Sequence, residues 1–394
     1  MFNKNLILLT FSQIFSFTAA PITVFLSGII GASMIETKSL ATLPVALMVV
    51  GTAFGSIFAS YTMSKLGRKY GFMIGSLIIS ISALFASYSV FKNFFIIYCI
   101  SNFLIGIGHA FASQYRFAAA ENVKKDFIPN AISIILFGSM IGALIGPNIA
   151  TITKDFIPLR IYSGSYIFLS LLTIIPFFFF LFYSDVKITR EKTNKKFFKR
   201  SYIKLLFQPK FFQAVVSACV GYCIMSLLMT ATPISMHIHN HISIGKTGFV
   251  IIFHIIAMFM PSLITGSLIK KFGQNNVMFL GVFVFFMSIF LNFVHQSFYN
   301  YFFGLIFLGI GWNFLFISGS TLLVSSYKSE EKFKAQGLND FIVFTSQAIG
   351  ALSAGFLLNN FGWKLINLFC IPLLLILVIT ILISNKKENL SKKI

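Results

Sequence analysis

Charged residues are scarce in this sequence, and acidic residues are the scarcest. Lys, Arg, Asp and Glu make up 10% of the 394 residues, whereas about 25% is usual for a soluble globular domain. Hydrophobic residues make up 57% of the chain. A protein with this composition cannot cover its surface with charge. We therefore predict an all-α membrane protein that crosses the bilayer many times.

The sequence also lacks the residues that a metal site, a nucleotide-binding loop or a disulfide framework would need. All four cysteines fall inside apolar stretches, where they are expected to pack as small hydrophobic side chains. They are Cys99, Cys219, Cys223 and Cys370. His237, His239 and His241 alternate along the chain, but no fourth ligand follows them. No Gly-x-x-x-x-Gly-Lys-[Ser/Thr] loop is present to hold a nucleotide phosphate. We expect no metal, no cofactor and no enzymatic activity.

The formal net charge of +21 comes from lysines and arginines that lie between apolar runs rather than on one soluble face. This distribution argues against a nucleic-acid partner and favours contact with the lipid bilayer. We divide the chain into twelve membrane spans, each about as long as a helix needs to cross the hydrocarbon core. The predicted spans cover residues 6–35, 42–63, 70–90, 94–119, 129–152, 161–183, 211–234, 247–269, 277–293, 301–324, 338–358 and 363–383.

The basic residues fall mostly on one side of these twelve spans. If the N-terminus is cytoplasmic, the segments on the outer side hold only six of the 31 basic residues, which are Lys38, Lys92, Lys154, Arg160, Lys246 and Lys364. Because positive charge is retained on the cytoplasmic side, we predict that both termini are cytoplasmic. The expected location is the inner (plasma) membrane of a bacterial-type cell.

The chain contains an internal repeat at nearly one offset. Ser60-Tyr-Thr-Met-Ser-Lys-Leu-Gly-Arg-Lys69 returns 206 positions later as Gly266-Ser-Leu-Ile-Lys-Lys-Phe-Gly-Gln-Asn275. The Gly-Ile-Gly at 106–108 returns at 309–311, and Ile-Gly-Ala-Leu at 141–144 returns at 349–352. Duplicated apolar spans are typical of secondary transporters. We predict two pseudo-symmetric six-helix bundles, at residues 1–183 and 211–394, joined by a basic cytoplasmic linker at residues 184–210.

Twelve spans in two halves, with a repeated basic loop, resemble the major facilitator superfamily. The loop at residues 60–69 resembles that superfamily's signature, but Ser60 replaces a glycine and Ser64 replaces an aspartate. In the family this loop helps to close the cytoplasmic side. The resemblance therefore implies an inner gate, and we predict that Arg68 or Lys69 pairs with Glu121 there. The inner-gate candidates are Ser64, Lys65, Gly67, Arg68, Lys69, Arg116, Glu121 and Asp340, and capping of a helix is the alternative role for Asp340.

The fifth span carries a regular stripe of glycines. Gly138, Gly142 and Gly146 are four residues apart and give a smooth helix face for close packing, while Pro147 permits a bend. The stretch 138–150 also resembles the glycine-proline signature of antiporters in the superfamily, with Ala150 where a glycine is usual. Helix packing alone and antiport remain alternative interpretations of this stripe.

Uncharged polar residues in mid-span are the candidates for substrate contact. In the superfamily's arrangement their spans line a central cavity, and unpaired polar groups would be costly against lipid. We expect His109, Trp312 and Asn313 to form the core of the site, because His109 and Trp312 follow the two Gly-Ile-Gly copies. The further candidates are Gln13, Asn148, His254 and Gln347.

We predict a monomeric secondary transporter that moves a small organic solute by alternating access. The expected mode of transport is proton-coupled antiport, which would export the solute. The alternative is uptake of a nutrient or vitamin-like solute. A transporter-shaped receptor or scaffold that binds without flux is the alternative from a different class.

Overall fold

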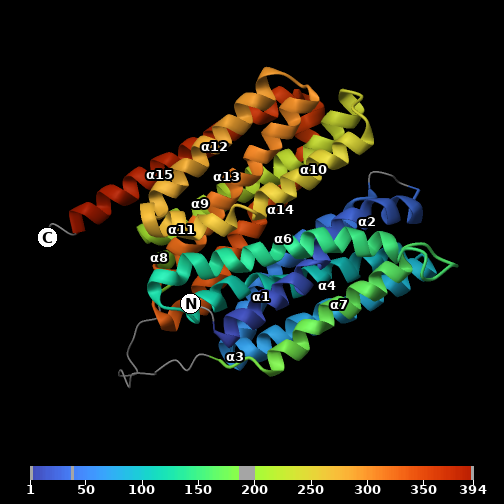
Figure 1. Ribbon diagram of the computed structural model, residues 1–394, viewed down its shortest axis with the longest axis horizontal. Helices are drawn as coiled ribbons and strands as arrows, with labels where there is room; N and C mark the ends of the chain where they lie inside the picture. The colour runs from blue at the N-terminus through green and yellow to red at the C-terminus, as the bar shows by residue number, and fades with distance from the viewer. Residues whose placement is uncertain (1–2, 37–39, 186–199, 392–394) are drawn as a thin grey trace. The chain divides into compact units, whose positions relative to one another are not determined.

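The computed structural model describes residues 3–36, 40–185 and 200–391, which fold into helices and connecting turns (Figure 1). Most of the basic linker predicted at 184–210 lies outside these residues. The contacts group the chain into two units, each described by itself below. Unit 1 comprises Met1–Lys124, Ile134–Lys199 and Ser329–Thr345, and unit 2 comprises Lys125–Ser133, Arg200–Lys328 and Ser346–Ile394. The division predicted from the sequence stays a prediction.

Unit 1 is built around α3, which packs closely against α4 and α7. Its helices are α1 (Lys4–Phe17), α2 (Ala19–Met34), α3 (Leu43–Lys92), α4 (Phe95–Ser113), α5 (Tyr115–Glu121), α6 (Ile128–Ile152) and α7 (Ser163–Leu181). The first part of α14 (Lys332–Leu368) also belongs here, and the first residues of α6 belong to unit 2. α1 ends at Phe17 because Pro21 has no N–H to donate to the Phe17 carbonyl.

Unit 2 is built around α13, which packs against α9, α10 and α12. Its helices are α8 (Tyr202–Leu206), α9 (Pro209–Pro233), the π-helix η3 (Ile234–His239), α10 (Ile244–Phe259), α11 (Ser262–Phe272), α12 (Gln274–Val294), α13 (Phe298–Val324) and α15 (Cys370–Ser391), together with the later part of α14. Pro261 separates α10 from α11, so the predicted eighth span is interrupted in its middle.

Among the residues that the structure describes, ten helical segments are long and apolar enough to cross a membrane. Two of them, of 50 and 58 residues, are far longer than the 20 or so that one crossing needs. Each of these two is broken by a glycine with non-helical backbone angles, Gly67 in α3 and Gly362 in α14. Counting both halves of each gives twelve spans, which agrees with the predicted all-α architecture.

The two Gly-Ile-Gly copies make equivalent contacts, each inside its own unit. A side chain at Gly106 would meet the backbone of Met48 and Thr52, and one at Gly309 would meet the backbone of His254 and Met258. Gly108 lies in the same way against the third predicted span, and Gly311 against the ninth. These contacts have the close helix approach that small residues allow in membranes. The structure therefore carries the duplication that the sequence predicts.

The glycine stripe of α6 packs against the first span. Side chains added at Gly138, Gly142 and Gly146 would meet the carbonyl oxygens of Thr10, Ile14 and Thr18. The stripe is therefore used for close packing inside unit 1. Pro147 lies within α6, which continues past it to Ile152.

Candidate functional site

A sharp turn at Gly67 places Arg68 inside unit 1. Gly67 has φ 86° and ψ 173°, a backbone region that is nearly exclusive to glycine. The next residue, Arg68, is buried, whereas Ser64 and Lys65 on the other side of the turn are exposed. The turn thus separates one buried arginine from the exposed part of the basic loop.

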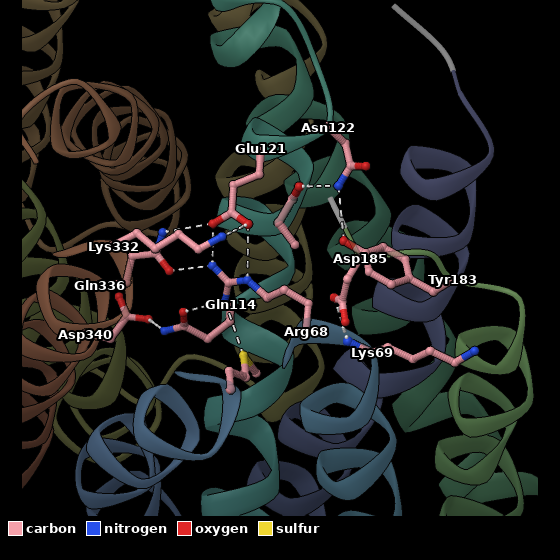
Figure 2. Close-up of polar contacts among 12 residues, drawn as sticks. Arg68, Lys69, Gln114, Glu121, Asn122, Tyr183, Asp185, Lys332, Gln336 and Asp340 are labelled. Atoms are coloured by element: carbon pink, nitrogen blue, oxygen red, sulfur yellow. Dashed lines mark hydrogen bonds and ion pairs between the residues drawn. The ribbon is translucent and has the colours of Figure 1, made fainter. Parts of the chain in front are cut away.

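Arg68 forms an ion pair with Glu121 at the end of α5 (Figure 2). The distance from Nη2 of Arg68 to Oε1 of Glu121 is 2.7 Å. Arg68 also donates to Oε1 of Gln114 at 3.2 Å and to Oε1 of Gln336 at 2.5 Å. The pairing of Arg68 with Glu121 that the sequence suggested is therefore present. Its action as a gate stays a prediction.

Glu121 is also held from the beginning of α14. Nζ of Lys332 donates to Oε2 of Glu121 at 2.9 Å, and Nε2 of Gln336 donates to Oε1 at 3.4 Å. Figure 2 shows Lys332, Gln336 and Arg68 converging on this carboxylate. The first turns of α14 are consequently tied by charge to α3 and α5 within unit 1.

A second ion pair joins Arg116 of α5 to Asp340 of α14. Asp340 has no exposed surface, and it accepts further hydrogen bonds from Gln114 at 2.8 Å and Ser113 at 3.2 Å. The alternative that Asp340 caps a helix is wrong, because α14 begins at Lys332, two turns earlier. Removal of one partner from a buried ion pair typically costs about 3–5 kcal/mol, so both pairs are expected to hold this end of α14 firmly.

We call the five charged residues of these pairs the ionic network: Arg68, Arg116, Glu121, Lys332 and Asp340.

The remaining inner-gate candidates lie outside the ionic network. Ser64 is exposed and donates to the carbonyl of Tyr61, and Lys65 lies over the Tyr61 ring. The backbone N–H of Lys69 donates to Oδ1 of Asp185 at 3.1 Å, just beyond the end of α7. Asp185 therefore places a carboxylate beside the Gly67 turn, close to the loop in which Ser64 replaces the expected acid.

The cavity candidates of unit 1 lie on α1, α4 and α6. Gln13 donates to Oγ of Ser139 at 2.7 Å, while no partner is found for its Oε1 among the described residues. His109 is half-buried, its ring lies 5.7 Å from that of Phe17, and its Nδ1 likewise has no partner within the described chain. Asn148 is exposed and donates only to Leu144 in its own helix. Their contact with a substrate stays a prediction.

Two of the candidates in unit 2 serve the packing of helices. Nδ2 of Asn313 donates to the Met258 carbonyl and to Oγ of Ser262, and its Oδ1 accepts from Thr265, each at 2.7 Å. These bonds join α13 to the interruption between α10 and α11. His254 is fully buried, and its Nδ1 donates to the Leu305 carbonyl at 2.7 Å, while no partner is found for its Nε2 among the described residues. Gln347 lies half-buried on α14. A role for these three in substrate contact stays a prediction.

Trp312 is 1% exposed and lies among three other aromatic rings. Its ring is stacked on Phe316 and meets Tyr222 and Phe259 edge to face. Trp312 belongs to unit 2 and His109 belongs to unit 1, so the site that the two residues were expected to share stays a prediction.

A sequence model described as Major Facilitator Superfamily matches residues 6–237 and 214–393, which together span almost the whole chain. The chain belongs to this superfamily.

Two curated relatives are riboflavin transporters by name. The chain is 30% identical over 386 residues to the riboflavin transporter RfnT of Brucella anthropi, covering 98% of this chain and 97% of the relative. It is 25% identical over 168 residues to the riboflavin transporter RibZ of Clostridioides difficile, covering 42% of this chain and 37% of the relative.

Solved structures of the superfamily share the fold. The crystal structure of the human organic anion transporter MFSD10 matches with a TM-score of 0.77 and 13% identity, over 96% of this chain and 99% of that one. At this identity the likeness concerns the fold alone.

As a member of the Major Facilitator Superfamily, the protein is a multi-pass membrane transporter of a small molecule and not an enzyme. The predicted family, fold class and transport function are thereby confirmed. Proton coupling, antiport, monomeric state and the orientation of the termini stay predictions.

Sequence reasoning named Asp340 of α14 but missed Lys332 and Gln336, which contact Glu121 from the same helix. Lys332, Gln336 and Asp340 are spaced four residues apart and so lie on one face of a helix. That spacing could have indicated the network. The predicted span begins at residue 338, however, so Lys332 falls in the cytoplasmic segment before it.

Proposed function

We propose that this transporter takes up riboflavin or a closely related vitamin-like solute. The observation that carries the proposal is the 30% identity to riboflavin transporter RfnT, which extends over 98% of the chain. The second relative named for riboflavin agrees with the same substrate. Uptake is the alternative to export that the sequence left open.

In this proposal the polar atoms of unit 1 contact the solute. Riboflavin has a flat, largely apolar ring system with hydrogen-bonding groups at one edge, and it carries a ribityl chain rich in hydroxyls. A half-buried imidazole beside an aromatic ring, as at His109 and Phe17, suits such a ligand because it offers both a stacking surface and a hydrogen bond. Gln13 offers an amide oxygen nearby, one turn before Phe17.

The transport cycle is proposed to be alternating access by a monomer in the inner (plasma) membrane, with both termini cytoplasmic. The distribution of lysine and arginine supports this orientation. The ionic network then lies at the cytoplasmic end and stabilises the state that is closed on that side. Protons are the proposed coupling ion.

Export remains the second candidate, on the observation that the stretch 138–150 resembles an antiporter signature. The stripe's packing against α1 explains its glycines without any export function. Growth of a riboflavin auxotroph separates the two directions. An importer should permit growth on low external riboflavin, whereas an exporter should raise the riboflavin requirement.

The decisive experiment is counterflow of labelled riboflavin in proteoliposomes. Vesicles loaded with unlabelled riboflavin should accumulate label, and collapse of the proton gradient should leave this exchange intact while abolishing net uptake. A receptor or scaffold would bind riboflavin without exchange.

A pair of histidine variants tests the proposed contact. His109→Ala should weaken riboflavin binding tenfold or more, about 1.4 kcal/mol. His295→Ala is the matched control, because His295 is exposed just beyond the end of α12, so its change should alter the affinity by less than twofold. Full riboflavin exchange by His109→Ala would remove His109 from the site.

A further inference from the structure

Four aromatic side chains of unit 2 form a cluster that we call the aromatic cluster: Tyr222 of α9, Phe259 of α10, and Trp312 and Phe316 of α13. Trp312 is the central member, because its ring centroid lies within 5.5 Å of each of the other three. Trp312 and Phe316 are stacked at an interplanar angle of 19°. Tyr222 stands nearly perpendicular to both of these rings.

The cluster contains a buried hydrogen-bond donor for which the described residues offer no acceptor. Trp312 is 1% exposed, and its Nε1 has no hydrogen-bond partner among the residues that the structure describes. Buried tryptophan N–H groups usually find a partner, since leaving a buried donor unsatisfied is costly. A phenylalanine would supply the same stacking without this cost. The indole N–H is thus an unexplained polar group at the centre of the aromatic cluster.

Tyr222 connects the cluster to its surroundings. It is half-buried, whereas Trp312, Phe259 and Phe316 are almost completely covered. A flat ligand that reaches Tyr222 would therefore meet the edge of the cluster. Because Trp312 is 1% exposed, contact with its N–H would also require the neighbouring aromatic side chains to rotate.

We propose that the aromatic cluster binds the heteroaromatic ring of the solute, with Tyr222 as the contacting ring and the Trp312 N–H as hydrogen-bond donor to a carbonyl oxygen or imine nitrogen. This inference rests on the proposed function. The isoalloxazine ring of a flavin fits because it is flat, and because its pyrimidine side carries carbonyl oxygens and imine nitrogens that can accept a hydrogen bond. A purely aliphatic solute would use neither feature.

Trp363 provides a matched control, since the chain has only two tryptophans. It is also buried, at 2% exposure, and its Nε1 also has no partner in the described part of the chain. Its ring contact is with Tyr301, which is fully buried and hydrogen-bonded to Ser235. Trp363 therefore repeats the chemistry of Trp312 without a half-exposed ring beside it.

The experiment measures binding of riboflavin and of lumiflavin, which lacks the ribityl chain, to purified protein by quenching of flavin fluorescence. Trp312→Phe keeps a stacking ring and removes only the N–H donor. It should weaken the binding of both flavins tenfold or more, while Trp363→Phe should change neither by more than twofold. Tyr222→Ala should weaken both flavins, and Tyr222→Phe should retain the affinity of the wild type.

The outcomes separate this inference from the proposed function. If the wild type binds riboflavin and Trp312→Phe binds it equally well, the aromatic cluster is packing alone and riboflavin transport still stands. Equal weakening by Trp312→Phe and Trp363→Phe would also overturn the inference, because it would indicate a general loss of packing. A wild type that binds neither flavin would overturn both proposals. If Trp312→Phe fails to fold, full flavin affinity in Tyr222→Ala would overturn the inference, and a tenfold loss there would support it.

Discussion

At the scale of single residues, the ion pair between Arg68 and Glu121 gives the most specific prediction. Arg68→Glu would place a second carboxylate against Glu121 in a buried setting, so we expect transport to fall at least tenfold. Adding Glu121→Arg to the same molecule should restore part of the activity, because an ion pair can form again. Restoration should be incomplete, since Lys332 then faces a cation. Counterflow of labelled riboflavin measures each variant.

The control for this charge reversal is Lys65→Glu, in the same loop. Lys65 is exposed, and an exposed charge contributes only about 0–1 kcal/mol, so transport should change by less than twofold. If the double variant shows no rescue although it reaches the membrane in normal amounts, the pair does not act as a gate.

Asp185 allows a second prediction at this scale. Its carboxylate accepts from the backbone N–H of Lys69, at the start of the helix that follows the Gly67 turn. A carboxylate that caps a helix start is worth about 1 kcal/mol. Asp185→Ala should therefore lower the melting temperature by a few degrees, as measured by a thermal-shift assay. Asp155→Ala should leave it unchanged, because Asp155 is exposed and forms only a loose pair with Lys154.

The sequence predicted part of the ionic network and could not predict the rest. Arg68 and Glu121 could be paired because both end apolar runs on the same predicted side. Arg116 was an inner-gate candidate without a predicted partner, and it pairs with Asp340. That choice depends on which face of α5 meets α14, and no sequence spacing encodes it.

At the scale of helices, the glycine turns are the strongest constraint. Gly67, Gly273 and Gly362 have φ between 73° and 86° and ψ between 159° and 173°. A residue with a Cβ pays about 1–3 kcal/mol to adopt such angles. Gly67 and Gly273 occupy equivalent places in the two copies of the repeated loop, so the sequence correctly marked both turns.

Three alanine variants should follow a definite order of stability. Gly67→Ala should be the most destabilising, because a Cβ there would also lie 2.5 Å from Oδ2 of Asp185. Gly273→Ala carries only the backbone strain, since nothing lies within 4 Å of its Cβ. Gly28→Ala lies in regular helix with open space and should stabilise by about 0.5–1 kcal/mol. Melting temperatures in one detergent should rank Gly28 above Gly273 above Gly67, and any inversion would contradict the assigned strain.

Helix interruptions were less predictable than helix existence. Runs of apolar residues identified every span because only a helix satisfies its own backbone in lipid. The break between α4 and α5 at Gln114 has no proline or glycine to announce it. Its cause is tertiary, because the Gln114 amide bridges Arg68 and Asp340 at that point.

At the scale of the whole molecule, the repeat accounts for two helices, α6 and α14, whose first residues group with a different unit than the rest of the helix. The start of α14 groups with unit 1, and the start of α6 groups with unit 2. Each start packs against one copy of the repeated loop: Gly337 lies against Ser60, and Asn130 lies against Gly266. The sequence repeat located the copies, but it carried no information about which helix each copy would touch.

The orientation of the chain gives the final prediction. In a variant whose four cysteines are replaced by serine, single cysteines at Lys92 and Asp155 should react with a membrane-impermeant maleimide in intact cells. Cysteines at Lys65 and Lys124 should react only after the membrane is permeabilised. All four positions are exposed in the structure, so poor access within the fold cannot imitate protection by the bilayer. Lys65 and Lys92 lie within the same 50-residue helix, α3, on either side of Gly67 and one span. If the cysteines at Lys65 and Lys92 were labelled from the same side, the half of α3 after Gly67 would not cross the membrane. If the pattern were reversed at all four positions, both termini would lie outside.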